Sequence, residues 1–100
     1  MVSAVLFHIT TRDAWQHAVG VGDYRSPSLE REGFIHLSTE AQWPGTRQRF
    51  YRDVPDLVLL VIDPARVDGE VRFEDADGDA YPHLYGALAV GAVVEVRALS

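Results

Sequence analysis

Hydrophobic and polar positions along the chain form short blocks, some with the pattern of strands and others with that of helices. The clearest strand covers residues 56–63, because the continuous apolar run from Leu57 to Ile62 is typical of a strand that is covered on both faces. Alternating or compact apolar stretches predict four more strands. These cover residues 2–9, 34–38, 70–74 and 93–99.

Three segments between these strands predict helices. Thr11 is a suitable N-cap for a helix that continues through residues 14–18 and ends at the following glycines. Residues 26–33 begin with Ser-Pro and end with a glycine, which predicts one short helical turn. Thr39 is expected to cap a further helix, which Pro44 either kinks or restarts.

The order of these elements indicates an α+β fold. Strands and helices are mixed without a strict βαβ rhythm, and the second half is nearly all strand apart from an acidic, turn-rich loop expected at residues 75–82. We therefore expect a mixed or antiparallel sheet with two or three helices. A chain of 100 residues is expected to form a single domain, residues 1–100.

Composition removes several classes of function. The chain has no cysteine and shows no signal-peptide pattern, and its longest apolar run is too short to span a bilayer. The net charge is −6, all of it in residues 51–100, which argues against a broad nucleic-acid surface. We expect a cytoplasmic protein with neither nucleic acid nor membrane as partner. All nine basic residues are Arg, which indicates either recognition of phosphate or carboxylate groups or biased codon usage.

Two short segments carry candidate chemistry. In an extended segment 34–38, Phe34, His36 and Ser38 share one face, while the residues between them point into the core. The alternative is a core histidine bonded to a carbonyl. In residues 81–86, His83 and Tyr85 again share a face if the segment is extended. The alternative there is a rigid turn with a packed tyrosine.

The end of the first strand provides a third candidate, where His8 is followed closely by Thr10. Strand ends are favoured positions for ligand contacts. A three-histidine metal site from His8, His36 and His83 is a further alternative, but the histidines lack the spacing typical of a metal site, so no metal is predicted.

Four segments together resemble a small bacterial family, domain-of-unknown-function family 952. They are residues 6–9 (LFHI), 33–38 (GFIHLS), 56–63 (DLVLLVID) and 82–86 (PHLYG). The family is grouped by fold with ADP-ribosyltransferases and RNA 2′-phosphotransferases, which bind NAD or an ADP-ribosylated intermediate in a split sheet. The resemblance therefore implies an ADP-ribosyltransferase-like fold and makes NAD the cofactor to test.

The resemblance also implies roles for particular residues. His8 matches the position that binds the adenosine-side ribose, and His36 with Ser38 matches the motif on the nicotinamide side. The third element in those transferases is a carboxylate that stabilises an oxocarbenium-like transition state. Glu95 is one candidate for it, and His83 or Tyr85 are candidates to occupy that region instead.

Together these features predict a cleft that binds a nucleotide-like ligand of the NAD or ADP-ribose type, or another small polar metabolite, and that supports group transfer. The alternative is a non-catalytic ligand-sensing or protein-interaction domain. The expected catalytic residues are His36, Ser38 and His83, and the expected ligand-binding residues are His8, Thr10, Phe34 and Tyr85.

Overall fold

A computed structural model describes residues 4–76 and 78–99 of the chain. In chain order the elements are β1 (Leu6–Thr11), α1 (Arg12–Val21), β2 (Asp23–Tyr24), α2 (Pro27–Glu32), β3 (Ile35–His36), α3 (Trp43–Phe50), β4 (Leu57–Ile62), η1 (Pro64–Arg66), β5 (Glu70–Ala76), β6 (Asp79–Tyr85), β7 (Leu88–Ala89), η2 (Val90–Ala92) and β8 (Val93–Ala98). The α+β class is confirmed. Within the described ranges, no helix has the length and apolar character needed to cross a membrane.

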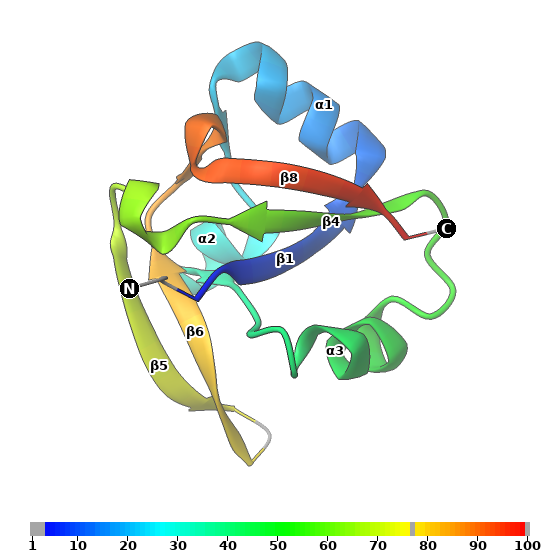
Figure 1. The fold of residues 1–100 in the computed structure, drawn as a ribbon, viewed down its shortest axis with the longest axis vertical. Coiled ribbons are helices and arrows are strands. Elements are labelled where there is room, and N and C mark those ends of the chain that lie inside the picture. Colours follow the sequence, from blue (N-terminus) through cyan, green and yellow to red (C-terminus); the bar gives the residue numbers. More distant parts are fainter. Residues whose placement is uncertain (1–3, 77, 100) are drawn as a thin grey trace.

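The strands form two three-stranded sheets, in the orders β1-β4-β8 and β3-β6-β5, and a two-stranded pair, β2-β7 (Figure 1). Every strand pair in the described residues is antiparallel, so of the two sheet types expected, the antiparallel one is observed. The two larger sheets are joined through the segment after β3. There Ser38 exchanges two backbone hydrogen bonds with Phe7 of β1, while the Leu37 N–H donates to the carbonyl of Pro82 in β6.

Strand β4 is the centre of the core. All six of its residues are buried, with Leu59 and Leu60 fully inaccessible. One face, including Leu60, packs on a cluster that contains Ala18 of α1. The other face, including Leu59, packs with Phe7 and is covered by aromatic residues at the two ends of α3. The prediction of a strand buried on both faces is confirmed.

Local signals set the ends of the first two helices. The Thr11 hydroxyl accepts a hydrogen bond from the Ala14 N–H, so Thr11 caps α1 as expected. Gly22 ends α1 with a φ of 110°, a conformation that glycine adopts without steric cost. The helix predicted at residues 26–33 is also present, as α2 between Ser26 and Gly33.

The third helix begins later than predicted. Thr39 does not cap it, because α3 starts at Trp43 and Gln42 is the capping residue. Residues 39–42 instead form a turn, in which the Thr39 carbonyl accepts hydrogen bonds from the N–H groups of Gln42 and Trp43. Pro44 lies in the first turn of the helix, where its missing N–H has no cost.

Pairing between strands corrects three other boundaries. The first strand runs from Leu6 to Thr11 rather than over residues 2–9, because all six residues pair with β4; residues 2 and 3 of the predicted strand lie outside the described residues. The strand expected at 34–38 is reduced to β3, Ile35–His36. Most of the loop expected at 75–82 belongs to a β-hairpin. Backbone pairing of β5 with β6, down to Ala76 opposite Asp79, overrides the turn preference of this acidic sequence.

Candidate functional site

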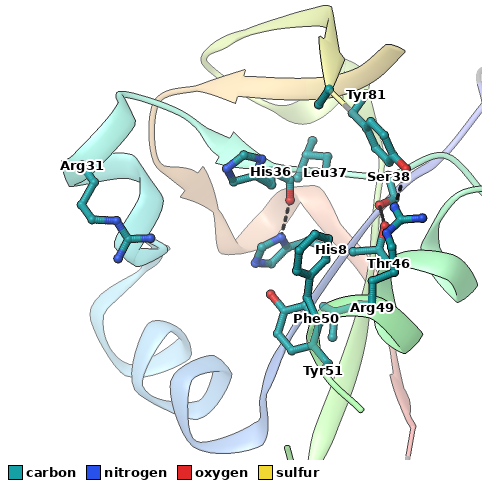
Figure 2. A pocket seen from close by; sticks show the side chains of 12 residues that line it. His8, Arg31, His36, Leu37, Ser38, Thr46, Arg49, Phe50, Tyr51 and Tyr81 are labelled. Carbon is teal, nitrogen blue, oxygen red and sulfur yellow. Dashed lines mark hydrogen bonds between the residues drawn. The ribbon is translucent and has the colours of Figure 1, made fainter. Parts of the chain in front are cut away.

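A pocket of about 480 Å³ lies between β1, the segment that joins the two large sheets, α2, α3 and the β5–β6 hairpin (Figure 2). This volume falls within the roughly 300–1,000 Å³ typical of small-molecule sites. Its lining residues are His8, Ile9, Arg31, His36, Leu37, Ser38, Thr46, Arg49, Phe50, Tyr51, Ala76 and Tyr81. The pocket is therefore assembled from elements that are far apart in the sequence.

The lining is cationic although the chain is acidic. Arg31 comes from α2 and Arg49 from α3, and no Asp or Glu of the ranges 4–76 and 78–99 is among the lining residues. In the view of Figure 2 the two arginines lie on opposite sides of the pocket. Nη2 of Arg49 donates a 2.8 Å hydrogen bond to the Tyr81 hydroxyl, which orients its guanidinium group. A cationic lining of this kind favours anionic ligands, since a guanidinium group matches the geometry of phosphate and carboxylate.

His8 is buried at the base of this pocket, and both of its ring nitrogens have partners inside the protein. Nδ1 lies 2.6 Å from the carbonyl oxygen of His36 and Nε2 lies 2.9 Å from the Tyr24 hydroxyl (Figure 2 shows the first bond). Burial is the main reason that the pKa of His8 falls from 6.5 to about 4. The hydrogen bond to the His36 carbonyl raises the pKa and offsets only part of this effect. At neutral pH the ring is uncharged, with its proton on Nδ1 donating to the carbonyl. Its nitrogens are used within the protein, so His8 offers a ligand only its ring edge.

His36 has the opposite character, with a side chain that is half exposed. Its Nε2 lies 2.7 Å from Oε1 of Glu32, the last residue of α2. With Nε2–H directed at this carboxylate, the neutral ring keeps Nδ1 as an acceptor. Ser38 lines the same pocket from a buried position, and its hydroxyl lies 3.4 Å from that of Thr46. A solvent-accessible imidazole oriented by a carboxylate can accept or donate a proton.

The remaining aromatic and histidine candidates form a cluster next to the pocket. The ring of His83 stacks on Phe34, with centroids 4.1 Å apart, and meets the edge of His36 at 5.1 Å. Glu74 Oε1 accepts hydrogen bonds from His83 Nδ1 at 2.8 Å and from the Tyr85 hydroxyl at 2.6 Å. Both bonds lower the pKa of Glu74, and the bond from Tyr85 has the larger effect. The same bond raises the pKa of Tyr85.

The structure thus divides the seven expected site residues into three groups. Three line the pocket: His8, His36 and Ser38. Three others, Phe34, His83 and Tyr85, belong to the adjoining cluster, which touches the pocket through His36. Thr10 lies outside the lining, where its buried hydroxyl is 3.0 Å from that of Tyr24.

Glu95, a candidate for the transferase carboxylate, lies on β8 and not in the pocket lining. Its carboxylate is paired with Arg97 at 2.9 Å. Glu32, by contrast, brings a carboxylate to a residue of the pocket lining, through its hydrogen bond to His36. Among the described residues, no group of three or more His, Cys, Asp or Glu side chains has the arrangement of a metal site.

Sequence reasoning missed the residues of the pocket that carry its charge and most of its aromatic surface. Those residues are Arg31, Arg49, Phe50, Tyr51 and Tyr81. The all-arginine composition is the one signal that pointed toward anion recognition. It did not distinguish these two arginines from the other seven, since nothing local in their segments marks them as site residues.

Comparisons with known proteins find one family and the solved structures of one protein that are similar to this chain. The model of a family described as "Protein of unknown function (DUF952)" matches residues 9–96. The crystal structure of protein CC0527 from Caulobacter crescentus is similar, with a TM-score of 0.88 and 30% identity over 96% of this chain and 86% of that chain. The solution NMR structure of CC0527 gives a TM-score of 0.78 and 31% identity, covering 92% of this chain and 81% of that one. No curated protein matches the chain.

Proposed function

The chain belongs to the DUF952 family, whose description names no activity, and we propose that its pocket binds a small anionic metabolite of the nucleotide type, such as ADP-ribose or NAD. One observation carries this proposal. Among the described residues, two arginines and four hydroxyl-bearing residues line the pocket without a carboxylate among them, in a protein with a net charge of −6. The four hydroxyl-bearing residues are Ser38, Thr46, Tyr51 and Tyr81.

Each part of such a ligand has a counterpart in the lining. Arg31 and Arg49 supply planar donor groups for phosphate oxygens. Phe50, with its ring largely exposed, and Tyr51 supply aromatic faces on which a base stacks. The hydroxyl groups supply donors and acceptors for ribose. A purely apolar ligand would pair with neither guanidinium group, so the lining favours an anion that also carries a ring.

The fold supports the same ligand class by analogy. We propose that the domain is ADP-ribosyltransferase-like, with a split sheet in which the ligand lies near the junction of two halves. Two observations support this: the β1-β4-β8 and β3-β6-β5 sheets are separate, and Ser38, which pairs with Phe7 where they are joined, also lines the pocket. Fold analogy by itself does not establish an activity, so the pocket remains the main support.

Group transfer is the second candidate function, and the His36–Glu32 pair favours it. The carboxylate 2.7 Å from Nε2 orients the imidazole at the edge of the pocket, where Nδ1 could take a proton from an attacking hydroxyl group. In such a transfer the bond between the nicotinamide nitrogen and ribose C1′ of NAD would break, and nicotinamide would leave. Chromatographic detection of nicotinamide after incubation with NAD would support transfer, whereas binding without release would favour the sensing role.

Titration calorimetry with three ligands tests the binding proposal. ADP-ribose and adenosine monophosphate should bind, and adenosine, which lacks phosphate, should bind more weakly by about tenfold or more, the effect of losing one charge-assisted contact. Replacing Arg31→Gln should reduce the preference for the phosphorylated ligands. Arg66→Gln is the matched control, because Arg66 lies on η1, outside the pocket lining, with an exposed side chain.

Two results would show that the arginines do not bind the ligand. One is equal affinity for adenosine and its monophosphate, which would show that the arginines do not contact the ligand. The other is unchanged affinity in the Arg31→Gln and Arg49→Gln variants, provided that their thermal unfolding without ligand shows them to be folded. Failure of all three compounds to bind at millimolar concentration would reject the nucleotide class.

A further inference from the structure

Strand β8 leaves one edge of the β1-β4-β8 sheet open in the part of the chain that the structure describes. β8 pairs with β4 on one side only, and its residues from Val94 to Ala98 are exposed. Val94 and Val96 are 50% and 40% exposed, which is high for β-branched residues in a strand. An exposed strand edge with apolar side chains is a template for pairing with another strand.

The hydrogen-bond pattern between β4 and β8 shows which backbone groups point outward. The Leu99 N–H donates to the Leu57 carbonyl, so these two residues form a hydrogen-bonded pair. In an antiparallel ladder such pairs alternate with non-bonded ones, so Arg97 opposite Leu59 is hydrogen-bonded and Val96 opposite Leu60 is not. The N–H and C=O groups of Val96 therefore point away from β4, toward the open edge.

The sequence of this edge is complementary to itself when read in the antiparallel direction. Val96 has an acidic residue on one side, Glu95, and a basic residue on the other, Arg97. If two copies of β8 pair antiparallel with Val96 opposite Val96, Glu95 of each copy lies directly opposite Arg97 of the other. Opposite charges at facing positions stabilise antiparallel pairs, whereas like charges at those positions destabilise them.

We propose that a second copy of this chain binds at β8, with a two-fold axis at Val96, so that the two sheets join into one six-stranded sheet. The two outward-pointing backbone groups of Val96 would then bond to those of its counterpart. Arg97 already contacts Glu95 of its own strand at 2.9 Å, so the four charged groups would alternate in sign around the axis. The interface is closed, because pairing uses the β8 edge of both copies and leaves no β8 edge for a third.

This inference is independent of the proposed ligand. No residue of β8 lines the pocket, so dimerisation and binding can fail separately. It also distinguishes a second copy from an arbitrary partner, because a charge pattern that reverses around one central residue is what a two-fold axis requires. A different protein would need charges complementary to those of β8. Such a partner would not require β8 to be complementary to itself.

Charge reversal at two positions tests the proposal by sedimentation velocity or light scattering over a concentration series. The wild-type protein is expected at twice the 11.1 kDa mass of one chain. Glu95→Arg places Arg opposite Arg, and Arg97→Glu places Glu opposite Glu, so each variant alone should be monomeric. An equimolar mixture of the two should form a heterodimer, and the double variant should dimerise again, because both restore facing opposite charges.

Circular dichroism checks that each variant is folded, and Arg66→Glu, on the exposed η1 segment, controls for a general effect of charge. This control should remain dimeric. A wild-type protein that is monomeric up to its solubility limit would overturn the proposal. So would single variants that stay dimeric, or a mixture of the two that shows no heterodimer.

Discussion

Mild acid should destabilise this protein through one buried histidine. The pKa of His8 is about 4 in the folded protein and 6.5 in its ordinary state, because burial penalises the charged ring. Between these two values the unfolded chain binds more protons than the folded one, so the free energy of unfolding falls as the pH is lowered. The contribution of the neutral His8 ring to the free energy of unfolding is fully present above the ordinary pKa of 6.5 and is lost progressively toward pH 4.

The size of the effect follows from the same two values. One pKa unit corresponds to about 1.4 kcal/mol, so the full difference is worth about 3 kcal/mol, and about 2 kcal/mol of it should be lost between pH 7 and pH 5. Stopping near pH 5 keeps the measurement above the range in which carboxylates take up protons. Glu74 is such a group, with a pKa that hydrogen bonds from Tyr85 and His83 lower further.

Urea unfolding at the two pH values measures this loss directly. The wild-type protein should lose about 2 kcal/mol of unfolding free energy. The His8→Gln variant should be less stable at pH 7, because the Tyr24 hydroxyl and the His36 carbonyl lose partners, but should change little between the two pH values. His17→Gln removes an exposed histidine of α1 outside this network and should keep the acid-dependent loss.

The reasoning would be refuted in two ways. A wild-type loss below about 0.5 kcal/mol would mean that His8 is already protonated in the folded state or that it is more accessible to water than its burial indicates. An equal loss in His8→Gln would assign the acid sensitivity to other groups.

Three further substitutions, the last with a matched control, test the core, the pocket and a tight backbone contact. Leu59→Ala should cost about 2–5 kcal/mol in chemical denaturation because its side chain is fully buried, and a cost below about 0.5 kcal/mol would contradict the central place of β4. His36→Ala should weaken ADP-ribose binding in calorimetry more than it lowers the denaturation midpoint, since its side chain is half exposed; the reverse would assign His36 to structure. Gly69→Ala should destabilise by about 1–3 kcal/mol, because the new Cβ would lie 2.5 Å from the Tyr85 carbonyl oxygen. Gly20→Ala meets no atom within 4 Å and should stabilise α1 by about 0.5–1 kcal/mol, so a similar effect at both glycines would contradict the steric argument.

Much of the fold was predictable because its signals are local or strongly periodic. The apolar run of β4 predicts a strand buried on both faces, and Thr11 caps α1 as its position suggests. The strand predicted at residues 70–74 is part of β5, but the rest of the hairpin that β5 forms with β6 was not predictable in this way. Its acidic, glycine-containing sequence resembles a loop, and only pairing down to Ala76 and Asp79 makes it a strand.

The candidate site likewise has residues that the sequence indicated and residues whose role depends on tertiary structure. Alternation along the strand and resemblance to a family brought His36 and Ser38 to attention, and both line the pocket. The role of His8 was not visible in the sequence, because it depends on Tyr24 and on the His36 carbonyl, which approach only in the folded chain.

The sequence by itself therefore determined the α+β class, the central strand, the ends of the first two helices and a short set of polar candidates. These properties depend on residues that are neighbours along the chain. Tertiary structure decided which candidates share a pocket and which ring nitrogens of His8 and His36 have partners within the protein. It also brought Arg31 and Arg49 together, which makes the lining cationic. The physical reason is distance along the chain: a pocket is formed by side chains from separate elements, and their proximity depends on how the sheets and helices pack.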